Sequence, residues 1–160
     1  MSFSAAGILF QYEAKFLSGW NPSLLKGGAW SGFGGKRRGT EYSIQTAIRE
    51  VIEEMFQVNP STDDIHVLEE ILSPFDFEQN GDYVVFFMNV SSLFQISVFL
   101  EKKGYRSPLY SSFPTNVVDL LEARILPEGN TYEITHLCFL DASFSSAPLD
   151  QYFKSDLLLC

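Results

Sequence analysis

The chain has 160 residues, of which 46% are hydrophobic, a size and composition that fit one globular domain with a sizeable core. Its formal net charge of −9 disfavours general nucleic-acid binding, because proteins that bind polyanions normally carry a basic surface. The two cysteines, Cys138 and Cys160, are too few for a disulfide framework and lack zinc-ligand spacing. The acidic charge has two interpretations: a surface that keeps the protein soluble, or a cleft that holds divalent cations.

No segment of the sequence has the pattern of a membrane span or of a signal peptide. No stretch approaches the ~20 consecutive apolar residues that are needed to cross a bilayer. Residues 1–10 lack a basic start, and their pattern is typical of a strand rather than of a signal peptide. We therefore expect a cytoplasmic protein without membrane association.

Strand and turn signals come first along the chain, and a helix follows them. Residues 5–16 predict a strand or hairpin, residues 18–22 a loop, and residues 27–36 form a glycine-rich stretch. Thr40 or Ser43 is expected to cap the helix, and Pro60 ends any continuation beyond Asn59. The helix itself is predicted by apolar residues at i, i+3, i+4, i+7, i+8 and i+11, which form one stripe: Ile44, Ala47, Ile48, Val51, Ile52 and Met55.

Beyond the helix the pattern predicts a mixture of strands and helices. Residues 65–72 and 83–90 are interpreted as strands, and the Asn80-Gly81 pair between them is a strong hairpin signal. The remaining expectations are a helix or strand at 93–103, a helix at 116–126, a strand at 131–140 and a helix at 149–159. The sequence therefore predicts an α/β fold with helices packed on a mixed sheet. We expect a single domain over residues 1–160 with an insertion at residues 91–130.

Three glutamates, Glu50, Glu53 and Glu54, share one face of the predicted helix. At 100° per residue they occupy an arc roughly 80–100° wide, about 140° from the apolar stripe. Their like charges repel by roughly 0.2–0.5 kcal/mol per pair, and a bound divalent cation reverses that cost. For this pattern alone, a solvated helix face is the commoner interpretation.

The residues around this face change that balance. The sequence reads Gly35, five residues, Glu41, seven residues, and then Arg49-Glu50-Val51-Ile52-Glu53-Glu54. This pattern resembles the Nudix box, which continues with one further residue, a glycine and an aliphatic residue. From average residue usage, a chance match at these positions is on the order of one in a million for this length.

The resemblance implies a Nudix-type α/β/α sandwich with a mixed β-sheet, and an enzyme that is a divalent-metal-dependent pyrophosphohydrolase. It implies Glu50, Glu53 and Glu54 as ligands of Mg²⁺ or Mn²⁺, joined by the backbone carbonyl of Gly35. Arg49 is implied to orient these carboxylates, so that Arg49, Glu53 and Glu54 are the expected catalytic residues. Glu41 is implied as a structural acid of the box.

The chain departs from the box where the helix ends and in the loop before it. Phe56 replaces the glycine that normally lets the chain turn, which indicates a longer helix or a different exit. Gln57 replaces the aliphatic residue, and Val58 supplies an apolar contact one residue later. The loop at residues 36–40, which reads Lys-Arg-Arg-Gly-Thr, lacks the common acid and glycine of the box at their usual positions. Every residue implied to touch metal is present, which favours an active enzyme.

The glycine-rich stretch bears on the substrate. Residues 28–36 resemble the Trp-x-Gly-Phe-Gly-Gly-Lys run of the nucleotide-sanitising, 8-oxo-dGTPase-like branch, which hydrolyses purine nucleoside triphosphates. Trp30 and Phe33 are candidates for stacking on a base, although burial is the commoner role of such aromatics. Three basic residues either contact phosphate or form a solvated loop: Lys36, Arg37 and Arg38.

Three functional hypotheses follow. The first is a nucleoside triphosphate pyrophosphatase, and the second is an enzyme for a nucleotide sugar, a dinucleotide or an RNA cap. The third is a catalytically inactive module that binds a nucleotide or a protein. The partner expected is a nucleotide, and a homodimer is compatible with the resemblance although no residue argues for it. The general base is either a glutamate of the helix or an acid from a loop outside the box: Glu101, Asp119, Glu122 or Glu128.

Overall fold

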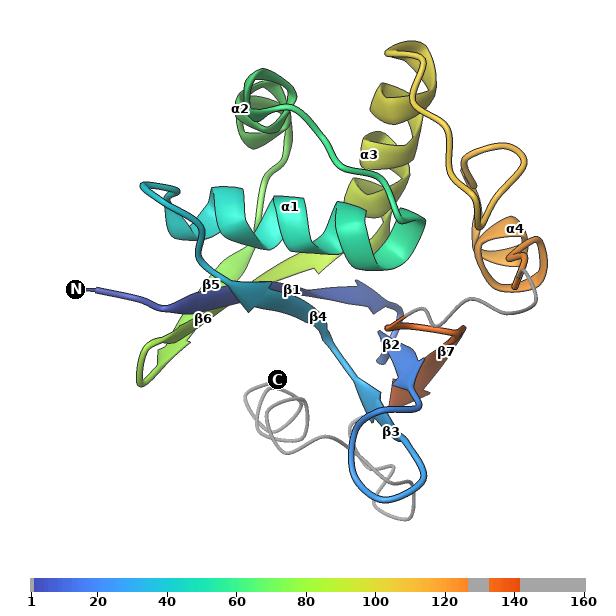
Figure 1. Cartoon of the computed structure of the whole chain (residues 1–160), viewed down its shortest axis with the longest axis horizontal. Helices are drawn as coiled ribbons and strands as arrows, with labels where there is room; N and C mark the ends of the chain where they lie inside the picture. The colour runs from blue at the N-terminus through green and yellow to red at the C-terminus, as the bar shows by residue number, and fades with distance from the viewer. Residues whose placement is uncertain (1, 127–132, 142–160) are drawn as a thin grey trace.

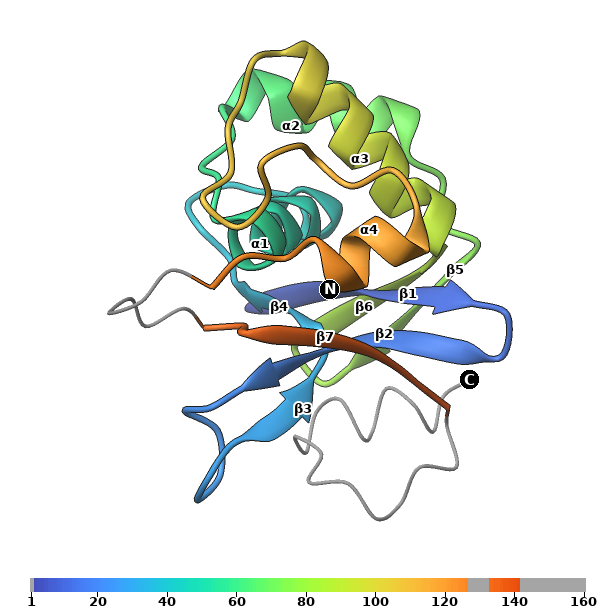
Figure 2. The ribbon, with the colours of Figure 1, turned by 90° about the vertical axis from the view of Figure 1, so that its right-hand side faces the viewer.

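The computed structural model describes residues 2–126 and 133–141 of the chain. Within these residues, seven strands form one mixed sheet, and Figure 1 shows the helices above it. Figure 2, turned by 90°, shows the four helices of the described residues on the same side of the sheet. The predicted α/β class with a mixed sheet is confirmed. The helix predicted at 149–159 lies outside the described residues.

The sheet is built around β1 (Ala5–Tyr12), whose central residues are buried. β6 (Tyr83–Asn89) runs parallel to β1 along one side. On the other side, β4 (Phe33–Lys36) pairs antiparallel with residues 5–8 of β1, and β2 (Lys15–Asn21) pairs with residues 11 and 12. Because β1 changes its partner along its length, β4 lies beside the first half of β1.

The outer strands are all antiparallel to their neighbours. β3 (Ala29–Ser31) and β7 (His136–Asp141) pair with β2, and β5 (Asp76–Asn80) pairs with β6. The loop predicted at residues 18–22 is therefore wrong over most of its length, because β2 continues to Asn21. Ser18 is fully buried there, and its hydroxyl donates a hydrogen bond to the carbonyl of Cys138 at 2.8 Å.

The predicted helix is confirmed as α1 (Ser43–Phe56), which packs on β1 and β4. Neither Thr40 nor Ser43 caps it, because the N-cap residue is Tyr42. The N–H of Tyr42 donates to the side-chain oxygen of Gln45 at 2.9 Å, so an acceptor inside the first turn satisfies this terminus. Five residues of the apolar stripe are 0% exposed: Ala47, Ile48, Val51, Ile52 and Met55.

The strand predicted at residues 65–72 is wrong, because α2 (Thr62–Ile71) occupies this segment. Ser61 caps α2 by accepting a hydrogen bond from the N–H of Asp64 at 3.2 Å. The partner of β6 is instead β5, and the turn between them contains Gly81 with a φ of +64°. The hairpin signal was therefore right in position, while the partner strand lies later in the chain than predicted.

The region predicted to be an insertion contains two helices. α3 (Val90–Lys102) resolves the choice between helix and strand at residues 93–103 in favour of a helix. α4 (Val117–Glu122) confirms a helix after Asn116, although it is shorter than predicted. The strand predicted at 131–140 is observed among the described residues as β7, which begins at His136. No helix among the described residues is long and apolar enough to span a membrane.

Candidate functional site

The carboxylates of α1 lie over β4, and Glu54 is the most deeply placed of them. Glu54 is 5% exposed, and one of its oxygens accepts a hydrogen bond from the N–H of Gly34 at 2.8 Å. Burial raises the pKa of Glu54 well above its ordinary value, and the nearby charge of Glu133 raises it further. The bond from Gly34 partly offsets this rise.

Gly35 lies directly against Glu50. A Cβ atom on Gly35 would come within 2.4 Å of the carboxyl carbon of Glu50. The absence of a side chain therefore lets the backbone of β4 approach the acidic face of α1. The structure thus brings together the glycine and the glutamate that the sequence pattern pairs as metal ligands.

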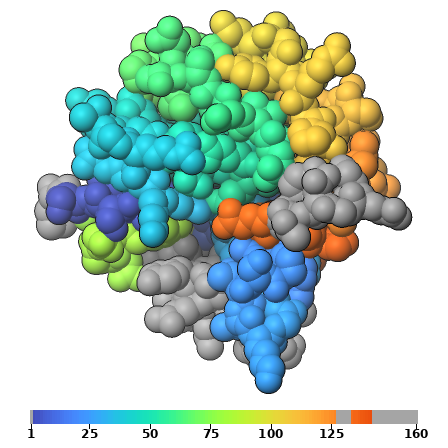
Figure 3. Space-filling model, in the orientation of Figure 1, coloured from blue at the N-terminus to red at the C-terminus, as the bar shows by residue number. Residues whose placement is uncertain are grey.

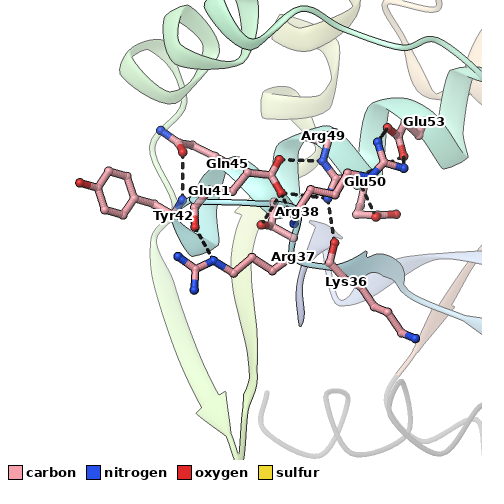
Figure 4. Close-up of polar contacts among 10 residues, drawn as sticks. Lys36, Arg37, Arg38, Glu41, Tyr42, Gln45, Arg49, Glu50 and Glu53 are labelled. Atoms are coloured by element: carbon pink, nitrogen blue, oxygen red, sulfur yellow. Dashed lines mark hydrogen bonds and ion pairs between the residues drawn. The ribbon is translucent and has the colours of Figure 1, made fainter. Parts of the chain in front are cut away.

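Arg49 holds the acidic residues in place from a nearly buried position. Its side chain is 6% exposed and lies at the centre of the contacts drawn in Figure 4. Nε and Nη2 donate to the carboxylate of Glu41 at 2.7 and 3.0 Å, and Nη2 also donates to the carbonyl of Lys36 at 2.8 Å. Nη1 donates to Glu50 at 2.8 Å and to Glu53 at 3.2 Å.

Arg49 and Glu41 stabilise the ionised forms of each other's side chains. Burial by itself lowers the pKa of Arg49, but its bonds to Glu41 and Glu50 outweigh burial and raise that pKa. Burial raises the pKa of Glu41, whereas the bonds from Arg49 and from the N–H of Arg38 outweigh it and lower that pKa. Arg49 therefore stays charged and Glu41 ionised at neutral pH, as orienting and structural residues require.

The three basic residues of the loop point in different directions. The guanidinium of Arg38 donates to both carboxylate oxygens of Glu53, at 2.9 and 3.5 Å. Arg37 instead donates to the carbonyl of Glu41 at 2.9 Å, and its guanidinium lies 4.8 Å from the ring centre of Phe3. Arg38 thus reaches the acidic cluster, whereas Arg37 is turned away from it (Figure 4).

Two cavities meet at the acidic face of α1. The first has a volume of about 360 Å³ and is lined by the three glutamates of α1 together with Arg38 and Glu133. The second has a volume of about 610 Å³, and Glu54 and Glu133 line it as well. Lys36 lies at the second cavity. The two carboxylates therefore stand where the cavities join.

Glu133 is the site residue that the sequence did not single out. It lies three residues before the start of β7, and in the space-filling view the segment entering β7 (orange) lies against α1 (teal) (Figure 3). Burial raises the pKa of Glu133, and the charges of Glu50 and Glu53 raise it further. The sequence placed the expected base on the helix or in residues 91–130, and no local pattern marks Glu133 as a further candidate.

Of the acids proposed at residues 91–130, the three that the structure describes line neither cavity. Glu101 accepts a hydrogen bond from the N–H of Phe113 at 3.2 Å and thereby supports the loop after α3. Asp119 lies in the first turn of α4, Glu122 lies at its end, and neither lines the two cavities. Glu128 lies outside the described residues.

The two aromatic candidates for base stacking both make packing contacts within the protein. Phe33 is 1% exposed and belongs to the hydrophobic core, so it offers no face to a ligand. Trp30 packs edge-on against Trp20, with their ring centres 5.3 Å apart, and it lines neither cavity. The commoner role of such aromatics, which is packing, applies to both residues.

The departure from the box at Phe56 is absorbed by a longer helix. Phe56 is the last residue of α1, and Gln57 adopts the left-handed conformation with a φ of 54°. Phe56 is 0% exposed and packs on the rings of Tyr110 and Phe113. Val58 is buried, as expected for the late apolar contact. The region after α3 therefore covers the end of α1.

The donor chemistry of the acidic face suits a hard divalent cation. Carboxylate oxygens are the preferred protein ligands of Mg²⁺ and Mn²⁺, and Gly35 leaves room beside Glu50 that a side chain would fill. Among the described residues no three acidic, histidine or cysteine side chains stand in a ready metal-binding arrangement. Glu53 is bonded to Arg38 and Arg49, so a cation bound there would compete with these arginines for the carboxylate oxygens.

The chain resembles known proteins in its fold and not in its sequence. No protein-family model matches the sequence, and no curated protein is significantly similar to it. The Nudix hydrolase RenU from M. smegmatis superposes with a TM-score of 0.52 and 15% identity, over 98% of this chain and 82% of RenU. The DR0079 protein of Deinococcus radiodurans superposes with a TM-score of 0.50 and 12% identity, over 98% of this chain and 81% of DR0079. The chain therefore has the fold found in Nudix hydrolases.

Proposed function

We propose that the protein is a Nudix-type hydrolase, which uses Mg²⁺ or Mn²⁺ to cut a phosphoanhydride bond in a nucleoside diphosphate linked to another group. One observation carries the proposal: carboxylates from α1 and from the segment before β7 line one cavity, beside a buried arginine that bonds two of them. The shared fold and the box-like residues support it.

Each side chain has a role that its contacts support. Glu50, Glu53 and Glu54 would hold the cation, and Arg49 and the N–H of Gly34 keep these carboxylates oriented. A bound cation supplies neutralisation of the phosphate oxygens and a lower pKa for the attacking water. We assign Glu133 as the general base, because its carboxylate lines the cavity and its raised pKa lies closer to neutral pH.

The second cavity suits the nucleoside part of a substrate. It adjoins the first at Glu54 and Glu133, and polar side chains such as Asn21, Ser31 and Asp82 line it. We infer that the phosphates lie at the acidic face while sugar and base extend into this cavity. A nucleoside triphosphate is the substrate class favoured, and a nucleotide sugar, dinucleotide or RNA cap is the alternative.

An inactive binding module is the second candidate function, and one contact favours it. Arg38 already neutralises Glu53, which is one of the three glutamates that would hold the cation. If Arg38 remained there, the site would bind a nucleotide without hydrolysing it. We rank this candidate second because the Arg38 side chain is 63% exposed, so solvent can replace its contact.

A substrate panel tests the proposal. Nucleoside triphosphates, nucleotide sugars, dinucleotides and capped RNA would be incubated in ¹⁸O-labelled water with Mg²⁺, Mn²⁺ or EDTA. We expect turnover that depends on the cation, with ¹⁸O in a single phosphate product. A triphosphate pyrophosphatase releases a nucleoside monophosphate and pyrophosphate, whereas a nucleotide-sugar hydrolase releases a sugar phosphate. Saturable nucleotide binding without turnover of any substrate would overturn the enzymatic proposal and support the binding module.

A further inference from the structure

We propose that Arg38 is an internal counter-cation of Glu53, which a divalent cation displaces and a diphosphate draws away, so that the two ligands bind cooperatively. This inference rests on the proposed function, because it needs a cation site at Glu53. It assigns to a single exposed arginine the control of cation affinity.

Arg38 and Arg49 both contact Glu53, but they differ in how firmly they are held. The Arg49 side chain is 6% exposed and donates to three carboxylates and a backbone carbonyl. The Arg38 side chain is 63% exposed and bonds to the carboxylate of Glu53. An exposed ion pair contributes little to stability, so the Arg38 contact is the exchangeable one.

The backbone of Arg38 stays fixed while its side chain can turn. Its N–H donates to the carboxylate of Glu41 at 2.7 Å, and Glu41 is itself held by Arg49. The side chain therefore pivots from an anchored point at the edge of the acidic cavity. Arg38 also lines a neighbouring cavity of about 690 Å³ beside the first turns of α1, which gives the guanidinium space outside the acidic face.

Phosphate is the ligand that a displaced Arg38 would meet. A guanidinium presents paired N–H groups that match two phosphate oxygens as well as they match a carboxylate. A diphosphate in the acidic cavity would compete with Glu53 for Arg38 and would release Glu53 for the cation. Cation alone must displace Arg38, and diphosphate alone must face unneutralised carboxylates. Each ligand therefore removes the main cost of binding the other.

Direct measurement of Mn²⁺ binding tests the inference without any assay of turnover. Electron paramagnetic resonance would count free Mn²⁺ in titrations of the wild type, Arg38→Gln, Arg38→Lys and Arg37→Gln, with and without imidodiphosphate as a non-hydrolysable probe. The free Mn²⁺ concentration is corrected for chelation by the probe. Arg37→Gln is the matched control, because it removes a neighbouring charge that contacts Glu41 and Phe3 rather than Glu53.

We expect Arg38→Gln to bind Mn²⁺ alone about threefold to fivefold more tightly than the wild type, the range set by loss of one exposed ion pair. Arg38→Lys should fall in between, because lysine keeps the charge but loses the paired bonds. Arg37→Gln should remain within about twofold of the wild type, since long-range charge effects are screened. Imidodiphosphate should enhance Mn²⁺ binding at least threefold less in Arg38→Gln than in the wild type.

Two results overturn the inference separately from the proposed function. Equal Mn²⁺ affinity in Arg38→Gln and Arg37→Gln, or undiminished enhancement by imidodiphosphate in Arg38→Gln, would show that Arg38 does not guard Glu53, while Mn²⁺ binding itself would leave the proposed function standing. Failure of the wild type to bind Mn²⁺, with or without imidodiphosphate, would remove the cation site and both proposals with it.

Discussion

At the scale of single residues, Glu54 is a buried carboxylate that also belongs to the acidic face of α1. Glu54 is 5% exposed. Burial raises its pKa, and the nearby charges of Glu133, Glu50 and Glu53 raise it further. A residue that is unfavourable for stability and well placed for binding a cation is typical of functional sites. The site therefore stores charge repulsion that a cation would relieve.

Without a bound cation, Glu54→Gln should be more stable than the wild type, and this advantage should grow as pH rises. Because the folded pKa lies above the unfolded value of 4.5, the folded state binds the extra proton between these two pKa values. Stability therefore falls as pH rises through that window, by at most about 1.4 kcal/mol per pH unit for one proton. Glu54→Gln removes this fall and keeps an oxygen for the N–H of Gly34.

Urea unfolding in EDTA at pH 5 and pH 8 measures this effect. The stability advantage of Glu54→Gln over the wild type should be larger at pH 8 than at pH 5. An advantage that does not change with pH, or a variant less stable at pH 8, would contradict a buried carboxylate with a raised pKa.

The close packing of Gly35 against Glu50 leads to a second prediction. In Gly35→Ala the new Cβ would lie 2.4 Å from the Glu50 carboxyl carbon, so the Glu50 side chain must move away from Arg49. We expect the rate of hydrolysis to fall at least about tenfold, because a misplaced charged group loses much of its electrostatic stabilisation. Steady-state kinetics would show this loss, and a kcat equal to that of the wild type would mean that Glu50 tolerates displacement.

At the scale of elements, the end of α1 shows how a local rule is replaced by tertiary contacts. The box glycine is absent, and Phe56 continues the helix for one more residue. Gln57 then takes the left-handed conformation, and the hydroxyl of Ser107 donates to the carbonyl of Phe56 at 2.5 Å. Contacts from the region after α3 thus stabilise the end of α1, where a glycine would otherwise let the chain turn.

Substitutions at the two positions should have opposite effects on stability. Phe56→Gly should lower the free energy of unfolding by about 3–5 kcal/mol, because it removes a fully buried ring from the core. Gln57→Gly should be neutral or stabilising by up to about 1 kcal/mol, because glycine adopts a positive φ without strain. Urea denaturation of both variants compares them directly. A stable Phe56→Gly would show that the contacts with Tyr110 and Phe113 contribute little.

The elements themselves were predictable to different degrees. α1 has six apolar residues in a helical stripe, a signal long enough to exclude a strand. The segment 65–72 has only eight residues, and its apolar positions fit both alternation and a helix. The decisive signals, the cap Ser61 and the acids of the first turn, lie before that segment. Short windows miss such terminal signals.

At the scale of the whole molecule, Arg124 links three segments that are distant in the sequence. Its Nη1 donates to the carbonyl of Met55 at 2.7 Å, which belongs to the last turn of α1. Nη2 donates to the carbonyl of Ile134 at 3.0 Å, and Nε donates to that of Thr135 at 3.3 Å. Arg124 therefore positions the backbone next to Glu133 relative to α1.

Arg124→Gln should lower the free energy of unfolding by about 1.5–3 kcal/mol, the range for hydrogen bonds made by a charged group. It should also reduce kcat, because Glu133 loses its fixed position. Arg106→Gln is a matched control on an exposed arginine, with an expected change within about 0.5 kcal/mol. Equal stability and equal kcat in the two variants would exclude a positioning role for Arg124.

The contrast between local and distant residues explains which parts of the site could be predicted. Glu50, Glu53 and Glu54 share one helix, so their common face follows from helical spacing alone. Glu133 and Arg124 reach α1 through tertiary packing, and no local pattern marks either residue. The pairing of Arg38 with Glu53 likewise depends on how the loop before α1 folds back. The acidic face was therefore predicted, whereas its proposed base Glu133, the positioning residue Arg124 and the pairing of Arg38 with Glu53 were not.

The proposed function requires that the glutamates of α1 bind the cation on which hydrolysis depends. Initial rates against Mg²⁺ concentration, measured with the best substrate for the wild type, Glu53→Gln and Glu54→Gln, test it most directly. Glu70→Gln, an exposed glutamate of α2, is the matched control. We predict a loss in kcat of at least about a hundredfold in both site variants, with the control unchanged, because a lost ligand removes transition-state charge stabilisation. Rates in either site variant equal to those of the wild type would exclude that glutamate from the hydrolytic reaction.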